Sequence, residues 1–171
     1  KAQRKVILQA MQSVVNSNDA IRDTESRRFN LMAAPGYSEL IGELITLNFD
    51  RGLTAFILGD TPARLTPDAT TLNNWATNVN NAVEDNLNGL VSRDEYLGVF
   101  YPACQTNDLS GSTVVQPSSH MMLRTIVRND NVAFPWLAPA GPRRGTVDNA
   151  ARLGYVDSDT GEFVQTGLTA G

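Results

Sequence analysis

Residues 29–60 read FNLMAAPGYSELIGELITLNFDRGLTAFILGD, and this stretch decides the fold. Its first six residues, 29–34, are mostly apolar and are followed directly by Pro35 and Gly36. A short apolar run that ends at a Pro-Gly pair is typical of a strand that leads into a turn. We therefore expect a strand at the start of the stretch. A phosphate loop would occupy the same place, but Pro35 lacks an N–H and a single glycine makes a poor anion site.

The rest of the stretch predicts a helix and a second strand. Ser38 is expected to cap the helix and Gly52 to end it, because the apolar residues between them recur at helical spacing. Residues 53–59 are apolar without alternation, as expected of a strand that is covered on both sides. Two strands joined by a helix predict a parallel pair with a right-handed crossover.

The same alternation continues along the chain. Thr66-Pro67-Asp68 has the cap, the proline and the acid of a helix start, and apolar residues keep helical spacing from there to about Asn86. Residues 96–101 then predict a third strand. A helix from residue 117 to about residue 129 follows a polar loop that is rich in glycine and serine.

The two ends of the chain add a helix and a hairpin. Apolar residues between positions 2 and 15 recur at steps of three and four, which predicts an amphipathic helix. Near the other end, residues 153–156 and 162–165 flank the turn-forming sequence DSDTG, which predicts a β-hairpin.

The predicted fold class is therefore α/β: a three-layer domain with a mainly parallel sheet flanked by helices, plus a C-terminal hairpin. We divide the chain into three parts. Residues 1–28 form an N-terminal helix and connection, residues 29–145 form the α/β core domain, and residues 146–171 form a C-terminal strand and hairpin segment.

Composition narrows the classes of protein. The chain has 171 residues, of which 42% are hydrophobic and 19% charged, and this composition excludes a disordered chain. No apolar run approaches the ~18 residues of a membrane helix, and we expect no signal peptide. A single cysteine, Cys104, and a single histidine, His120, exclude a disulfide-stapled domain and a usual zinc site. The start at Lys1 rather than Met leads us to expect a piece of a longer protein.

The charge of the chain bears on its partners. A net charge of −4 has the wrong sign for general nucleic-acid binding. Between residues 53 and 123, two arginines stand against seven acidic residues. This asymmetry fits a basic partner surface, and it fits solvated helices equally well. Twelve of the fourteen basic residues are arginine, which suits ion pairs at protein interfaces but also fits a compositional bias of the source genome.

The motifs of common α/β enzymes are absent from the sequence. There is no G-x-G-x-x-G after a strand, no G-x-x-x-x-G-K-[ST] and no G-x-S-x-G. Ser118 and Ser119 precede His120, but we expect the serines to assist the helix start and His120 to be partly buried. Cys104 is expected as a small buried side chain in a loop after a strand. Residues 157–162 reverse the order of a calcium loop, which favours a hairpin turn. We therefore predict no enzymatic activity, no cofactor and no metal.

Four segments, in this order along the chain, resemble the contractile tail sheath proteins of myovirus-type bacteriophages, the tail sheath family with a subtilisin-like domain. They are similar to the family's strand–APGY–helix, its strand–D-x-P element, its P-P-S helix and its W-x-A-P-A-G…R-G loop. Here these segments are residues 29–37 with the following helix, 55–62, 117–130, and 136–141 with 144–145. Gln116 stands where the family has the first proline of the third segment, and residues around Leu123 and Thr125 are bulkier than the family's small ones.

The resemblance implies a structural protein. Family members have an α/β domain likened to subtilisin in topology but without its catalytic residues. They stack as hexameric rings around the tail tube, contact the baseplate, and shorten to drive the tube through the host envelope during genome delivery. Their terminal arms add strands to the sheets of neighbouring subunits. The resemblance thus implies a virion protein that is assembled in the host cytoplasm, with neither nucleic-acid nor membrane binding by this domain.

Two other classes of protein stay open at this point. One is the sheath of a non-viral contractile injection system, which sequence alone separates poorly from a phage sheath. The other is an α/β hydrolase or nucleotide-binding enzyme, which would need a preformed polar pocket with a perturbed titratable group. The 171-residue chain by itself is expected to be a folded monomer or a weak oligomer.

Arg143 and Arg144 are the candidate inter-subunit contacts. They follow a segment with prolines at 139 and 142 and a glycine at 141, so we expect a rigid loop that projects both arginines together. At least one of them is predicted to pair with an acidic surface of a neighbouring subunit. The alternatives are that both are solvated, or that Arg144 caps a helix end within its own domain.

Overall fold

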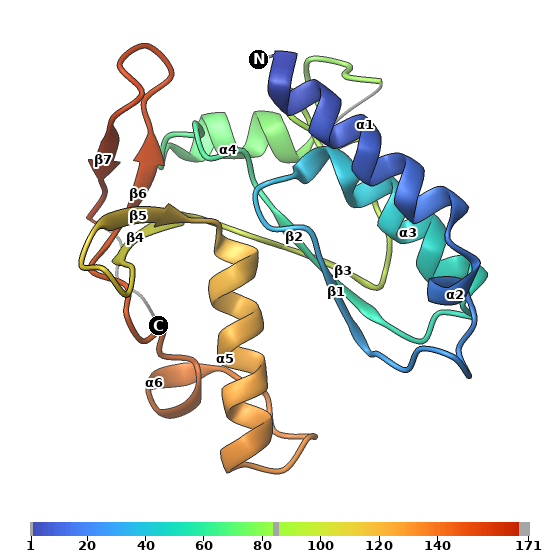
Figure 1. Cartoon of the computed structure of the whole chain (residues 1–171). Helices are drawn as coiled ribbons and strands as arrows, with labels where there is room; N and C mark the ends of the chain where they lie inside the picture. Colours follow the sequence, from blue (N-terminus) through green and yellow to red (C-terminus); the bar gives the residue numbers. More distant parts are fainter. Residues whose placement is uncertain (1, 84–85, 168–171) are drawn as a thin grey trace.

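Three short parallel strands form the first sheet, in the order β1-β2-β3 (Figure 1). They are β1 (Leu31–Ala33), β2 (Phe56–Asp60) and β3 (Leu97–Phe100) in a computed structural model that describes residues 2–83 and 86–167. Met32 lies opposite Ile57, and Leu58 lies opposite Gly98. The expected parallel strands are confirmed.

Helices contact both sides of the central strand β2. Side chains alternate along a strand, so the Ile57 side chain points to one side of the sheet while those of Leu58 and Asp60 point to the other. Ile57 packs in a buried cluster with residues of helix α3 (Ile41–Asp50), whereas Asp60 bonds the start of helix α5 (Ser118–Val132). The two helices therefore lie on opposite sides of β2.

The main apolar core lies between β1, β2 and α3. Its buried members are Met32, Leu44, Leu47, Ala55 and Ile57. Helix α1 (Ala2–Ser17) packs over α3 without burying any residue of its own, and the short helix α2 (Asp19–Arg22) follows it. Helix α1 thus covers the outer side of α3 through partly exposed side chains.

The second sheet is antiparallel, with the order β5-β4-β6-β7. It consists of β4 (Ala103–Asn107), β5 (Thr113–Gln116), β6 (Arg152–Val156) and β7 (Phe163–Gln165). The predicted C-terminal hairpin is confirmed as β6 and β7, and β6 also pairs with β4. The pair β4 and β5 was not expected, because both strands are short and carry several polar residues. The structure therefore combines a parallel sheet with a larger antiparallel one, and the sheet content is not mainly parallel.

Two predicted helix starts differ from the structure. Helix α4 (Ala69–Ala76) is capped by Asp68, whose carboxylate accepts from the Thr71 N–H at 2.9 Å, and not by Thr66. Ser38 caps nothing with its side chain, because it lies buried in a 3₁₀ turn, η1 (Ser38–Leu40), ahead of α3. The predicted stop at Gly52 is confirmed, since Gly52 takes a left-handed φ of 74° just after the helix.

The remaining helices differ from expectation in length. Helix α4 ends ten residues earlier than predicted, because Asn78 and Asn81 adopt left-handed backbone angles, which asparagine tolerates better than most residues. Residues 84 and 85, inside the helix that was predicted there, lie outside the described residues. A four-residue helix, α6 (Gly141–Arg144), forms in the proline-rich segment where none was expected.

Candidate functional site

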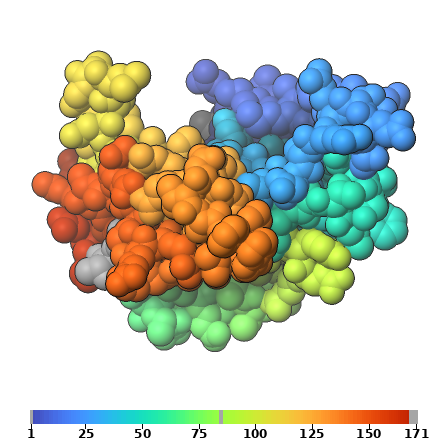
Figure 2. All heavy atoms as spheres, turned by 90° about the horizontal axis from the view of Figure 1, so that it is seen from below, coloured from blue at the N-terminus to red at the C-terminus, as the bar shows by residue number. Residues whose placement is uncertain are grey.

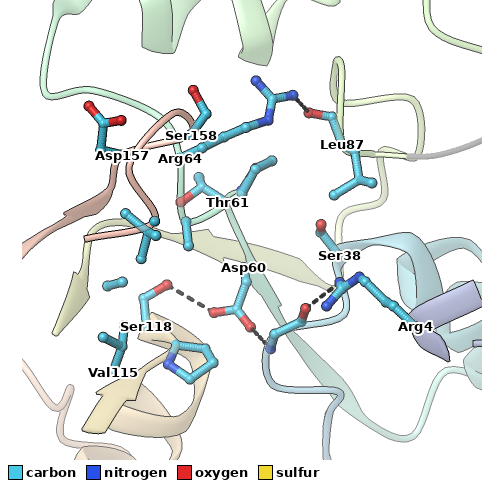
Figure 3. Close-up of a pocket in the computed structure, with 17 residues that line it drawn as sticks. Arg4, Ser38, Asp60, Thr61, Arg64, Leu87, Val115, Ser118, Asp157 and Ser158 are labelled. Atoms are coloured by element: carbon cyan, nitrogen blue, oxygen red, sulfur yellow. Dashed lines mark hydrogen bonds between the residues drawn. The ribbon is translucent and has the colours of Figure 1, made fainter. Parts of the chain in front are cut away.

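A buried carboxylate lies at the carboxyl end of the parallel sheet (Figure 3). Asp60 is the last residue of β2 and is 4% exposed. Its Oδ1 accepts from the Ser119 N–H at 2.6 Å and lies 2.9 Å from the Ser118 hydroxyl. Its Oδ2 accepts from the Ser119 hydroxyl at 2.7 Å and from the Gly36 N–H at 2.8 Å. Both oxygens of the carboxylate are therefore fully engaged.

The local folds explain why these groups meet. Pro35 and Gly36 form a tight turn in which the Tyr37 N–H bonds the Ala34 carbonyl and Gly36 has a φ of 81°, as in a type II turn. This turn points the Gly36 N–H at Asp60. Helix α5 begins at Ser118, so its first N–H groups and the positive end of its dipole face the same carboxylate.

Asp60 takes the place that a bound anion would occupy at a helix N-terminus. The turn after β1 and the N-terminus of α5 both direct an N–H to this side chain, as such turns and helix starts do to a bound phosphate in other proteins. The arrangement therefore holds three chain segments together. Ser119 is 0% exposed, so its hydroxyl is out of reach of a substrate.

A cavity of about 550 Å³ opens beside Asp60. Its lining includes two arginines that project from different elements, as Figure 3 shows. Arg4 pairs with Glu39 at 2.9 Å and donates to the Gly36 carbonyl, while Arg64 donates to the Leu87 carbonyl and to Asn88 Oδ1. Both cationic groups of the cavity are thus already bound to the protein itself.

The structure places two serines, the histidine and the cysteine as follows. Ser118 or Ser119 was expected to assist the start of α5, but neither side chain caps the helix. The Asp60 carboxylate accepts from the Ser119 N–H instead, and the serine hydroxyls contact that carboxylate. His120 is exposed, so the expectation that it is partly buried is wrong. Cys104 is buried as expected, but it lies in strand β4 and not in a loop.

Burial raises the pKa of the Cys104 thiol above its usual value. A thiol with a raised pKa is scarcely ionised at neutral pH, and only the thiolate is a good nucleophile. We expect a disulfide reagent to leave native Cys104 unmodified at pH 7.5 and to modify one thiol per chain in denaturant. Stoichiometric labelling of the native protein within minutes would contradict this prediction.

The segment after α5 is held by side chains of that helix. The Asn129 amide donates to the Leu137 carbonyl at 2.7 Å, and Arg128 donates to the Thr146 carbonyl at 2.6 Å. Arg128 also forms an ion pair with Asp148 and, through that hydrogen bond, lowers the pKa of the Asp148 carboxyl. The third and fourth segments of the resemblance are therefore joined to one another.

Arg143 and Arg144 differ in their surroundings. Arg143 is exposed and makes no hydrogen bond or ion pair with residues 2–83 or 86–167. Arg144 is half-buried, and its Nε donates to the Ala138 carbonyl of the same loop at 3.2 Å. The two side chains therefore do not project as an equivalent pair. Their contact with a neighbouring subunit stays a prediction.

The calcium-like sequence at residues 157–162 forms a turn, as expected. Asp157 Oδ1 accepts from the N–H groups of Asp159 and Thr160, and Gly161 takes a left-handed φ of 72°. Within the part of the chain that the structure describes, no three His, Cys, Asp or Glu side chains lie close enough to hold a metal ion. None of the described helices is both long and apolar enough to cross a membrane.

Sequence reasoning missed several buried polar residues that fix loops. Examples are Asn48, which both donates to and accepts from the backbone of Ala55, and Asn86, whose carboxamide bonds Ser38, Val91 and Ser92. No pattern in the sequence marks such residues, since a buried asparagine that fixes a loop cannot be distinguished in sequence from an exposed one. The role of Asp60 did carry a signal, because an acid directly after a buried apolar strand lies at the edge where parallel sheets build sites.

Comparison with protein-family models, with curated proteins and with solved structures finds no match to this chain.

Proposed function

We propose that this chain is a structural subunit of a phage contractile tail sheath, which polymerises around the tail tube and contracts during genome delivery. The observation that carries the proposal is the meeting of the four resembling segments. Gly36, Asp60 and Ser119, from the first three segments, share one buried carboxylate. Asn129 of the third segment holds Leu137 of the fourth. Segments that converge in one contact network form a single structural framework, as segments of one family domain should.

The framework favours rigidity over catalysis. In this proposal the parallel sheet, with α3 and α5 on its two sides, is the three-layer core of the sheath domain. Asp60 neutralises the start of α5, and the serines next to it serve as hydrogen-bond donors. A subunit that moves as a rigid body between two packings needs such a fixed core, since the change on contraction then falls on its interfaces.

The proposed partners are other sheath subunits in hexameric rings, the tail tube protein and the baseplate. The proposed location is the virion, after assembly in the host cytoplasm. The domain is proposed to have no enzymatic activity and to bind neither nucleic acid nor membrane. Its net charge of −4 supports the part of this that concerns nucleic acid.

Negative-stain electron microscopy of the full-length protein tests the proposal. We expect tubes or stacked rings of uniform diameter. A protein that stays monomeric at high concentration and under crowding would contradict it, as would stoichiometric labelling by a serine-hydrolase probe. The genes that flank this one distinguish a phage sheath from that of a non-viral contractile injection system.

Charge reversal at Arg143 tests the predicted inter-subunit contact. Arg143→Glu in the full-length protein should reduce tube formation, because each lost pair, although worth only about 0–1 kcal/mol, is repeated at every subunit. The matched control is Arg152→Glu, another exposed arginine, at the start of β6. Both variants should leave the melting temperature of the 171-residue chain nearly unchanged, because surface substitutions act within about 0.5 kcal/mol. Equal tube yields for the two variants would remove Arg143 from the interface.

A further inference from the structure

Two large aromatic side chains lie exposed just beyond the C-terminal end of α5. Phe134 is 62% exposed and Trp136 is 76% exposed. Their rings are stacked, with centroids 4.7 Å apart and planes at 3°. Val132, the last residue of the helix, is exposed as well. Aromatic side chains of this size are enriched in the buried centres of protein interfaces, where they contribute much of the binding energy.

The aromatic pair is held in place by its own loop. Pro135 lies between the two residues and restricts the backbone. The Leu137 N–H bonds the Phe134 carbonyl at 2.9 Å, and the buried Asn129 holds the Leu137 carbonyl at 2.7 Å. Because the loop is already ordered, binding through the pair loses little conformational entropy.

An apolar groove of about 590 Å³ lies elsewhere on the same chain, where α1 covers β1 and α3. It is lined by apolar side chains from all three elements and from the turn after β1, among them Ile7, Met11, Val14, Ala33, Pro35 and Leu44. A groove of this volume lies within the ~300–1,000 Å³ range of cavities that take drug-sized groups. It is therefore large enough to accept aromatic side chains.

The groove and the aromatic pair lie on opposite sides of the parallel sheet. The pair continues α5, which bonds Asp60 on one side of β2, whereas the groove belongs to α1 and α3 on the other side. In Figure 2 the orange segment that carries the pair and the blue N-terminal helix occupy separate regions of the surface. The aromatic pair therefore cannot fill the groove of its own chain.

We propose that the Phe134–Trp136 pair of one copy docks into the α1 groove of a second copy. Two different surfaces then meet, so the contact is head-to-tail and generates rings or open filaments, not closed dimers. This inference deepens the proposed function, on which it rests for the identity of the assembly. The two rings already cover one face of each other, so the pair can bury less than the roughly 300–500 Å² of two separate aromatic side chains. That is less than the ~800 Å² per partner of a stable interface, so the isolated contact is weak and gains strength by repetition.

Nuclear magnetic resonance on the 171-residue chain can detect such a weak contact. On concentration from about 20 μM to 1 mM, we expect shifts of the Trp136 indole N–H and of the Ile7, Met11 and Val14 methyl groups. Trp136→Ala and Val14→Glu should each abolish these shifts, because one variant lacks the aromatic pair and the other blocks the groove. Val14 is largely exposed, so its substitution leaves the core intact. Phe49→Ser, which removes an exposed aromatic outside the groove, is the matched control and should keep the shifts.

Mixing the two variants gives the decisive result. Trp136→Ala retains a working groove and Val14→Glu retains a working aromatic pair, so a 1:1 mixture should restore shifts in the groove of the first and in the indole of the second. Persistent shifts in Val14→Glu alone would show that the pairs dock on each other, and no shifts at any concentration would also overturn the proposal. Restored shifts without tubes in electron microscopy would refute the sheath and leave the contact standing. Normal tubes from full-length Trp136→Ala would refute the contact and leave the sheath standing.

Discussion

Asp60→Ala is expected to lower the free energy of unfolding by about 3–5 kcal/mol, because several buried hydrogen bonds to one charged acceptor are lost together. The variant leaves the N–H of Gly36 and both the N–H and hydroxyl of Ser119 without their acceptor. Each buried donor left unsatisfied costs about 1–3 kcal/mol. The start of α5 also loses the negative charge that complements its dipole. Urea denaturation of the wild-type and variant chains measures the difference.

A second aspartate in the same chain provides the control. Asp68 also accepts from the first turn of a helix, since its carboxylate bonds the Thr71 N–H, but it is exposed. Asp68→Ala is expected to cost about 1 kcal/mol, the usual cost of losing an N-cap. Asp60→Asn keeps the size of the side chain but turns an NH₂ group toward donors, so its cost should lie between those of the two alanine variants. If Asp60→Ala costs no more than Asp68→Ala, the buried carboxylate does not hold the three segments together.

Regular patterns in the sequence were sufficient to predict much of the parallel sheet. The apolar runs that became β1, β2 and β3 are bounded by turn residues, and the helix that became α3 has a clear apolar period. Such signals are local, so one sequence carries them in full. The hairpin of β6 and β7 was predictable for the same reason, because residues 157–161 have the composition of a hairpin turn.

The features that were predicted wrongly or missed depend on contacts between residues far apart in the sequence. Strand β4 has the sequence ACQTN, which carries no strong strand signal, and it forms because β5 and β6 pair on its two sides. Helix α4 stops early although apolar residues continue at helical spacing. Its last turn instead leads into a segment whose Leu90 N–H bonds the Trp75 carbonyl, and Asn86 accepts from the Trp75 indole. Tertiary hydrogen bonds of this kind override local propensity.

The candidate site was predictable in its parts but not in its arrangement. The resembling segments contain Gly36, Asp60 and Ser119, yet nothing local in the sequence says that one carboxylate accepts from the other two residues. The same holds for Arg144, whose bond to the Ala138 carbonyl depends on the fold of its loop. Distances between side chains become known only when the turn geometry and the strand register are known.

Arg51→Met is expected to lower the free energy of unfolding by about 2–4 kcal/mol, the second-largest effect among these predictions. Arg51 follows α3 and is 4% exposed, and its guanidinium donates to the carbonyl of Ile21 in α2 and to that of Arg27 in the connection between α2 and β1. It also stacks on the ring of Phe29 at 3.8 Å. Methionine keeps the apolar stem but provides no donors, so the Ile21 and Arg27 carbonyls lose the hydrogen bonds that hold them to this end of α3.

The loss at Arg51 should be local as well as global. Helix α1 has no fully buried residue and packs on the core only through partly buried side chains such as Val15. Polar contacts therefore add to its placement, with Arg4 and Glu39 at one end and the segment held by Arg51 at the other. Hydrogen exchange should therefore show faster exchange of residues 2–28 in Arg51→Met than in the wild type, while β2 stays protected in native conditions. Arg27→Ala is the matched control, because its side chain is exposed and its carbonyl still accepts from Arg51. Uniformly faster exchange across the chain, or equal effects of the two variants, would mean that Arg51 does not anchor the N-terminal helix.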